Sequence, residues 1–194
     1  MNEPLVRTFI AINLPANLRA AIAINQSQLK KKLPLECIKW TEPNQLHITL
    51  RFLGEILQSQ VSALETILGE ITPKFNSFSL NISGIGAFPD IKRPRVIWVG
   101  ISGETRQLFS LGKAIADATS NIGQIEEREF HPHITLGRVK SSNPSDLRTI
   151  GTTIQHIKLE QLGEWHVTQI DLMKSTLTPK GPIYECLKSF PLKS

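Results

Sequence analysis

The sequence contains the tetrapeptide His-Ile-Thr-Leu twice, at residues 47–50 and 133–136. In the composition of this chain, two chance copies among its five histidines have odds on the order of one in 100,000. An imidazole can donate or accept a proton near neutral pH, because its ordinary pKa is about 6.5. A threonine hydroxyl can donate a hydrogen bond to an oxygen that gains negative charge. The repeat therefore predicts a site with two imidazoles and two hydroxyls, one pair from each half of the chain.

Each copy lies in an apolar stretch that is typical of a β-strand. Side chains alternate between the two faces of a strand, so His47 shares a face with Thr49, and His133 shares one with Thr135. Displacement at phosphorus needs one neutral imidazole to take a proton from water and one imidazolium to protonate the departing oxygen. The entering and leaving oxygens lie on opposite sides of phosphorus, so one histidine on each side suits hydrolysis of a phosphodiester.

The apolar periodicity predicts strands and helices that alternate without a linker. Gly54 is expected to end the strand that carries the first motif, Ser59 to cap the helix after it, and residues 84–94 to form a long loop. The expected strands are residues 7–13, 38–40, 46–53, 78–82, 95–99, the second motif at 133–136, 166–174 and 184–190, and the expected helices follow Pro15, Ser59, Glu104 and Pro144.

This order of elements nearly repeats around the midpoint of the chain. Helices with one apolar face must bury that face against a sheet, which favours an α+β fold with two similar lobes. Each lobe is expected to be a mainly antiparallel sheet with helices on the outside, and residues 1–194 to form a single bilobal domain. A central groove between the lobes would hold both motifs, since clefts between lobes are preferred ligand sites.

The composition favours an anionic partner. The formal net charge is +5 and the isoelectric point is about 9.4, as suits a protein that attracts RNA or a nucleotide. The two cysteines, Cys37 and Cys186, lack metal-ligand spacing and are expected to be reduced. The apolar run at residues 9–14 is too short for a signal peptide or a membrane span, so we expect a cytoplasmic protein that does not associate with membranes. A single compact unit gives no reason to expect more than a monomer.

The residues around the two motifs resemble a known family. Residues 46–54 (Leu-His-Ile-Thr-Leu-Arg-Phe-Leu-Gly) and 130–138 (Phe-His-Pro-His-Ile-Thr-Leu-Gly-Arg) are similar to the two signature motifs of the two-histidine (2H) phosphoesterases. More narrowly, the chain resembles the bacterial and archaeal RNA 2′,3′-cyclic phosphodiesterases, also called 2′-5′ RNA ligases. The supporting segments are residues 7–12, 86–89, 94–100, 175–177 and 181–184.

The resemblance implies a reaction and a fold. The reaction is hydrolysis of 2′,3′-cyclic phosphate ends of RNA, or of cyclic nucleotides, to 2′-phosphomonoesters, without a metal or another cofactor. A reversible 2′-5′ ligation of RNA ends is the same displacement with a 5′-hydroxyl in place of water. The implied fold is the bilobal 2H phosphoesterase fold with the active site in the central groove.

The resemblance also implies roles for particular residues. His47 becomes the proton donor and His133 the proton acceptor, although the pseudo-symmetry of the repeat leaves the two roles interchangeable. Thr49 and Thr135 become phosphate ligands.

Three further residues have less certain places. Arg138 matches a family position that contacts phosphate or base, and Phe52 matches one that stacks on a base. Strict alternation turns both away from the motif histidines, so each needs a bulge or a strand end to reach the groove. A core position for Phe52 is an equal alternative to stacking. Arg51 has the correct parity and is a lesser candidate.

Two other classes of function stay open at this stage. A non-catalytic RNA-binding module would use the same positive groove but would not need duplicated His/Thr pairs. A metal-dependent hydrolase could use His131 and His133, which lie two apart on one strand face, but no nearby Cys, Asp or Glu completes a ligand set.

Overall fold

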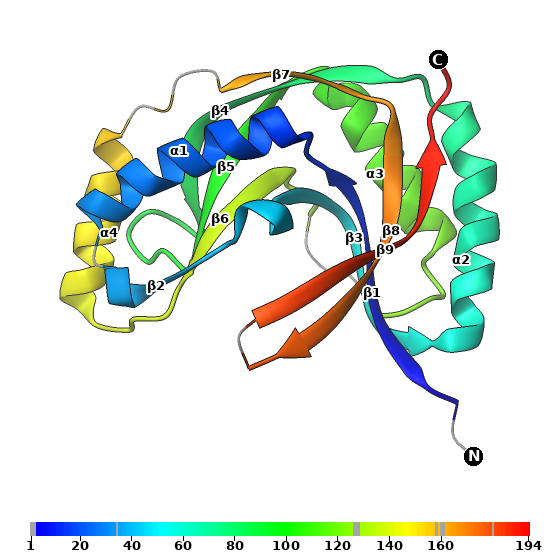
Figure 1. The fold of residues 1–194 in the computed structure, drawn as a ribbon, viewed down its shortest axis with the longest axis horizontal. Helices are drawn as coiled ribbons and strands as arrows, with labels where there is room; N and C mark the ends of the chain where they lie inside the picture. Colours follow the sequence, from blue (N-terminus) through cyan, green and yellow to red (C-terminus); the bar gives the residue numbers. More distant parts are fainter. Residues whose placement is uncertain (1–2, 34, 126–128, 158, 160–161, 180) are drawn as a thin grey trace.

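The fold was established from a computed structural model, which describes residues 3–33, 35–125, 129–157, 159, 162–179 and 181–194. Its strands lie in two groups with helices around the outside (Figure 1). No helix in this part of the chain is long and apolar enough to cross a membrane.

One group of strands, here called the His47 lobe, carries the first motif. It contains β1 (Leu5–Asn13), β3 (His47–Leu57), β8 (Gln169–Thr178) and β9 (Gly181–Pro191). β1 pairs antiparallel with both β3 and β8, and β8 pairs with β9. The closing hairpin therefore completes the sheet that the first strand began.

The other group, the His133 lobe, carries the second motif. It contains β2 (Ile38–Trp40), β4 (Phe78–Phe88), β5 (Val96–Gly103), β6 (His133–Val139) and β7 (Gly163–Val167). The lobes meet where β3 pairs with β6 at a single position, Ile48 opposite Ile134, which makes one continuous antiparallel sheet in the order β7-β4-β5-β6-β3-β1-β8-β9, with β2 beside β6. The two motifs are thus neighbours in the middle of the sheet.

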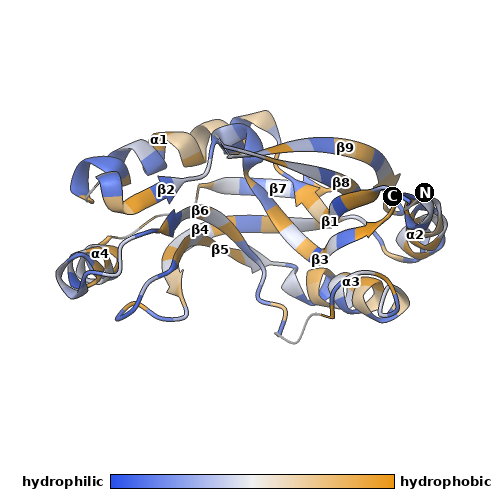
Figure 2. Ribbon diagram, turned by 90° about the horizontal axis from the view of Figure 1, so that it is seen from below, coloured by the Kyte–Doolittle hydropathy of each residue, from blue (hydrophilic) through white to orange (hydrophobic). Residues whose placement is uncertain are grey.

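In the part of the chain that the structure describes, four α-helices lie against the sheet, and each carries both hydrophobic and hydrophilic positions (Figure 2). α2 (Gln58–Ile71) and α3 (Thr105–Ala118) lie beside the His47 lobe, while α1 (Ala16–Lys32) and α4 (Pro144–His156) lie beside the His133 lobe (Figure 1). The predicted apolar faces of α1, α2 and α3 are confirmed, because the periodic positions are buried: Leu18, Ile22, Leu29, Val61, Leu64, Leu68, Ile71, Leu108, Leu111 and Ile115. α4 also buries Leu147, Ile150 and Ile154.

Two of these helices cross from one lobe to the other. α1 follows a strand of the His47 lobe, yet its buried Gln26 side chain donates to the carbonyl of Leu136 in β6 at 2.9 Å. α3 follows a strand of the His133 lobe and packs against β3. Each of these two helices therefore connects the lobe that it follows in the chain to the other lobe.

Several expected boundaries are wrong. Gly54 does not end its strand, because it takes a positive φ of 72° and β3 continues to Leu57. Ser59 does not cap α2, because the helix begins at Gln58, one residue before Ser59. The Leu57 N–H donates to Gln60 Oε1 at 2.9 Å, and the Ser59 hydroxyl donates to Glu3 at 3.0 Å.

The loop expected at residues 84–94 is shorter than predicted. Gly84 takes a φ of 73° at a register shift, and β4 then continues to Phe88. The strand expected at residues 166–174 is divided at Thr168 into the end of β7 and the start of β8, which pair with different strands. The Asn143 side chain caps α4 by accepting from the Ser145 N–H at 2.9 Å.

Candidate active site

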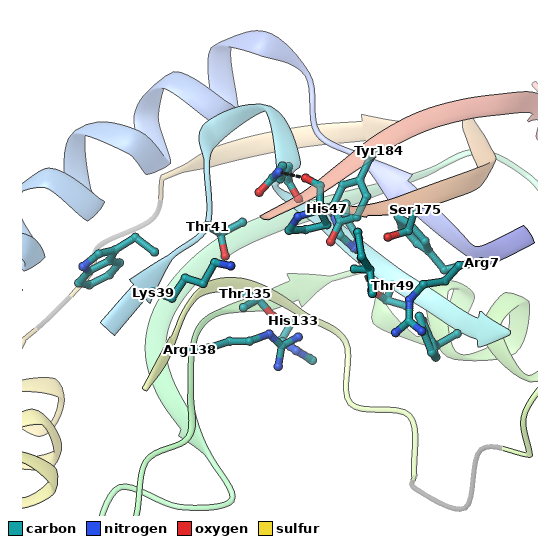
Figure 3. A pocket seen from close by; sticks show the side chains of 16 residues that line it. Arg7, Lys39, Thr41, His47, Thr49, His133, Thr135, Arg138, Ser175 and Tyr184 are labelled. Atoms are coloured by element: carbon teal, nitrogen blue, oxygen red, sulfur yellow. Dashed lines mark hydrogen bonds between the residues drawn. The ribbon is translucent and has the colours of Figure 1, made fainter. Parts of the chain in front are cut away.

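A pocket of about 380 Å³ lies where the two lobes meet (Figure 3). Both motifs contribute to it, together with β1, β2 and the β8–β9 hairpin. Its lining residues are Arg7, Phe9, Lys39, Trp40, Thr41, Gln45, His47, Thr49, Phe52, His133, Thr135, Arg138, Ser175, Leu177, Pro182 and Tyr184. The structure thus brings both predicted His/Thr pairs into one pocket.

Each histidine is held by a backbone carbonyl two residues before it. His47 Nδ1 lies 2.7 Å from the Gln45 carbonyl oxygen, and His133 Nδ1 lies 2.6 Å from that of His131. A carbonyl only accepts, so both Nδ1 atoms carry hydrogen and donate. The Nε2 atom of each ring is then left for chemistry, and that of His47 lies 3.0 Å from the hydroxyl of Thr49.

Aromatic rings surround both imidazoles. His47 packs between Phe9 and Tyr184, with ring centroids 5.0 and 5.4 Å away. His133 packs against Phe88 at 4.9 Å and Trp98 at 6.5 Å. These rings restrict each imidazole and remove water from its sides.

Burial lowers the pKa of both histidines below the ordinary value, because a charged imidazolium loses hydration there. The hydrogen bond to the backbone carbonyl partly opposes this in each case. The positive charge of Arg138 lowers the pKa of both rings further, and His133 also lowers that of His47. The two imidazoles and Arg138 are therefore close enough to influence one another's charge.

A bulge in each motif strand decides which side chains reach the pocket. The β1–β3 register shifts between Thr49 and Arg51, and the β5–β6 register shifts between Thr135 and Gly137. In both motifs the leucine after the threonine is the extra residue, and the alternation resumes one position out of phase. The two halves thus share the same local irregularity as well as the same tetrapeptide.

The bulges bring Phe52 and Arg138 to the pocket, where both are lining residues. Strict alternation would have turned them away. The Arg138 side chain lies beside His133 and Thr135 in Figure 3. Phe52 is half-buried: its ring lines the pocket and also packs against the buried cluster of Phe9, Ala11 and Met173, so it combines a wall position with a partial core position.

The bulge also corrects the expectation for Arg51. Its side chain lies outside the pocket, is 7% exposed, and donates from Nη2 to the carbonyl of Gln124 at 3.1 Å. Strict alternation from His47 would place Arg51 on the pocket face, but the extra residue Leu50 reverses the alternation and turns Arg51 to the other face.

Several polar residues of the pocket were not predicted from the sequence, among them Arg7, Lys39 and Tyr184. Arg7 lies at one end with its guanidinium 4.7 Å from the centre of the Phe52 ring. Lys39 comes from β2, and Tyr184 comes from the hairpin, where burial raises its pKa. No spacing pattern links these residues to the motifs. The segments around Arg7 and Tyr184 carried the family resemblance, which was the available signal.

The suggested metal pair does not form part of a larger ligand set. The His131 side chain is 60% exposed and points to Glu129 at 3.8 Å, while its carbonyl holds His133. Among the residues that the structure describes, no group of three or more His, Cys, Asp and Glu side chains is placed to hold a metal ion.

A family model described as LigT like phosphoesterase matches the sequence twice, over residues 12–98 and 99–184. The chain belongs to this family. Each match contains one His-Ile-Thr-Leu motif, so the two LigT-like halves agree with the internal repeat. The resemblance to 2H phosphoesterases is thereby confirmed.

Relatives of the LigT-like chain carry a consistent name. An RNA 2′,3′-cyclic phosphodiesterase of Aquifex aeolicus is 38% identical over 85% of this chain and 88% of its own length. Proteins of the same name from Archaeoglobus fulgidus and Methanocaldococcus jannaschii are 34% and 37% identical over 95% of this chain and 99% and 100% of their own lengths.

Solved structures confirm the α+β fold of the LigT-like family. A protein of Thermus thermophilus has a TM-score of 0.79 and 30% identity, covering 96% of this chain and 98% of its own. E. coli LigT in complex with 3′-AMP has a TM-score of 0.78 and 28% identity, covering 98% of this chain and all of its own.

Proposed function

We propose that this protein hydrolyses 2′,3′-cyclic phosphate ends of RNA to 2′-phosphomonoesters, with His47 as the general acid and His133 as the general base. One observation carries the proposal: two imidazoles line the same pocket, and each has Nδ1 bound to a carbonyl, so Nε2 is the nitrogen of each ring that can move a proton. The names of the relatives supply the substrate class.

The two histidines divide the proton transfers of one displacement. His133 Nε2 takes a proton from water while the water oxygen forms its bond to phosphorus. The bond between phosphorus and the 3′-oxygen breaks, and this oxygen takes a proton from His47 Nε2. The phosphate stays on the 2′-oxygen, and the net change is the addition of one water molecule.

The remaining pocket residues hold the charge and the base. The hydroxyls of Thr49 and Thr135 donate to the non-bridging oxygens, and the guanidinium of Arg138 supplies a positive charge beside them. Phe52, with Arg7 over its ring, gives the terminal base a surface for stacking. An RNA 5′-hydroxyl in place of water would give a 2′-5′ linkage by the same steps.

We also infer that residues 1–194 act as one bilobal domain and as a cytoplasmic monomer. One chain supplies every residue of the pocket described above, so the proposed chemistry does not call for a second copy. Cys37 and Cys186 are both free, which is typical of a reducing compartment.

The test is to follow a short RNA with a 2′,3′-cyclic phosphate end by phosphorus NMR, with and without a chelator. We expect a 2′-phosphate as the product and the same rate in both samples. A 3′-phosphate would mean that the other oxygen leaves. Loss of turnover with the chelator would favour a metal-dependent hydrolase, and binding without turnover would favour an RNA-binding module.

A further inference from the structure

The pocket carries more positive charge than one cyclic phosphate requires. Arg7, Lys39 and Arg138 line it, and no Asp or Glu does. Among the described residues, none forms an ion pair with these three cations. A cyclic phosphodiester has one negative charge, which in the proposed mechanism faces Arg138 and an imidazolium.

Lys39 and Arg138 are direct neighbours across two strands. β2 pairs antiparallel with β6, and in this register Lys39 lies opposite Arg138. Side chains at such positions share a face with Cβ atoms about 4.5–5.5 Å apart, and like charges there destabilise the pairing. Both side chains are exposed at the pocket, and no Asp or Glu of the pocket lining lies between them. An anionic ligand would relieve this repulsion.

Lys39 lies at the end of the pocket opposite to Arg7, with the two histidines between them (Figure 3). The tip of the β8–β9 hairpin closes the same end, since a methyl group placed on Gly181 would lie 3.7 Å from Lys39 Nζ. The Gln45 side chain ties this tip to the first motif by donating to the Pro182 carbonyl. The lysine ammonium is thus placed at the end of a groove and not on open surface.

The stereochemistry of a nucleotide assigns a ligand to this end. In a nucleotide, the base is attached to C1′ and the 5′ chain to C4′, on the two sides of the ring oxygen. The cyclic phosphate bridges the oxygens on C2′ and C3′. With the cyclic phosphate between the histidines and the base on Phe52 near Arg7, the 5′ chain points toward Lys39. The next atom group along an RNA in that direction is a phosphodiester.

We propose that Lys39 binds the phosphodiester on the 5′ side of the terminal nucleotide. The site then prefers an RNA 3′ end of two or more nucleotides to a free cyclic mononucleotide. This inference rests on the proposed function, because that function sets the orientation of the terminal ribose.

The test compares three substrates with the wild-type protein: a 2′,3′-cyclic mononucleotide, a dinucleotide with the same cyclic end, and that dinucleotide with a neutral methylphosphonate as its internal linkage. We expect the charged dinucleotide to have the lowest KM. The KM of the methylphosphonate dinucleotide should not depend on Lys39, as for the mononucleotide, because its internal linkage carries no charge for the lysine ammonium to bind.

The variant is Lys39→Gln, and its matched control is Lys140→Gln, an equal loss of charge at an exposed residue next to β6 that does not line the pocket. In Lys39→Gln we expect KM for the charged dinucleotide to rise about two- to fivefold, as for one solvent-exposed charge contact. The slope of log KM against log salt should fall by about 0.7, the value for one phosphate of a single strand. Its kcat, and its KM for the other two substrates, should stay as in wild type.

Equal losses on the mononucleotide and the charged dinucleotide would overturn the proposal, and so would no loss on either. A separate measurement does not need turnover: calorimetric titration with a dinucleotide and a mononucleoside that each end in a 2′-phosphate. Tighter binding of the dinucleotide that depends on Lys39 supports the subsite even in a protein without cyclic phosphodiesterase activity. Equal binding of both compounds by wild type rejects it.

Discussion

The two motif histidines are alike in their local surroundings. Each donates from Nδ1 to the carbonyl two residues earlier and packs against two aromatic rings. This similarity fits two groups that handle protons of the same displacement from opposite sides.

Replacing either histidine should therefore remove catalysis without removing the fold. We expect His47→Ala and His133→Ala each to lower kcat/KM by a factor of about 100 to 10,000, the usual contribution of one general acid or base. His156→Ala is the control, because His156 is exposed on α4 outside the pocket. A near-normal rate in either of the first two variants would contradict acid–base work by these residues.

The pH dependence should show the lowered pKa values. Activity of the free enzyme needs one neutral and one protonated imidazole, so kcat/KM should have a bell-shaped profile. Because burial places the pKa of both rings below the ordinary 6.5, the maximum should lie on the acid side of 6.5. A profile that is flat from pH 5 to 9 would argue against this assignment.

Arg138 provides a test of direction for the same profile. Its positive charge lowers the pKa of both histidines, so Arg138→Gln should raise both values and move the whole bell toward higher pH. The rate will fall as well, since a phosphate contact is lost. The shift in pH is the informative measurement, and an unmoved profile would show that Arg138 acts on the substrate alone.

The alternation of side chains along a strand was predictable from the sequence, and the effect of the two bulges was not. The period of two placed His47 with Thr49 and His133 with Thr135. It could not place Phe52, Arg138 and Arg51, because a bulge depends on the register with a neighbouring strand and leaves little trace in the motif itself.

At the scale of elements, two helical glycines offer a matched pair. A Cβ at Gly69 in α2 would meet nothing within 4 Å, whereas one at Gly151 in α4 would lie 1.9 Å from the carbonyl oxygen of Ile91. Gly69→Ala should raise the free energy of unfolding by about 0.5–1 kcal/mol through helix propensity. Gly151→Ala should lower it by about 1–3 kcal/mol, because the backbone must move apart.

Urea unfolding of both variants beside wild type measures the difference. The same substitution in the same kind of element should change stability in opposite directions. If both variants shift alike, the close approach of α4 to residues 89–95 is not rigid in solution.

Helix and strand identity was mostly predictable, and boundaries were not. The apolar faces of α2 and α3 followed from spacing alone, as buried Leu64 and Leu111 illustrate. Glycine favours turns, so Gly54 predicts the end of a strand, but β3 tolerates a positive φ there and continues to Leu57. Local signals cannot show when a neighbouring strand extends the pairing.

The whole molecule should lose stability when its buried histidines become charged. In the folded state the pKa values of both histidines lie below 6.5. As the pH is lowered through 6.5, the unfolded chain therefore binds more protons than the folded chain, and the free energy of unfolding decreases. The double variant His47→Asn and His133→Asn should lose less stability between pH 7.5 and pH 5 than wild type. Denaturant unfolding at the two pH values tests this, and an equal loss in both proteins would refute it.

The pseudo-symmetric arrangement of the lobes was predictable, but the exchange of helices between them was not. Periodicity tells which face of α1 is buried and does not tell which sheet covers it. The bond from Gln26 to Leu136 joins elements far apart in the chain, and the choice of partner is made by the packing of the whole sheet.

The place of the β8–β9 hairpin has a consequence for the newly made protein. Tyr184, Pro182, Leu177 and Ser175 reach the pocket from this hairpin, and β8 is also the outer partner of β1. Translation proceeds from the N-terminus, so residues 169–191 leave the ribosome after both motifs have emerged. A chain that has emerged only as far as the second motif therefore lacks four lining residues of the pocket, and the site can be complete only after Tyr184 has been added.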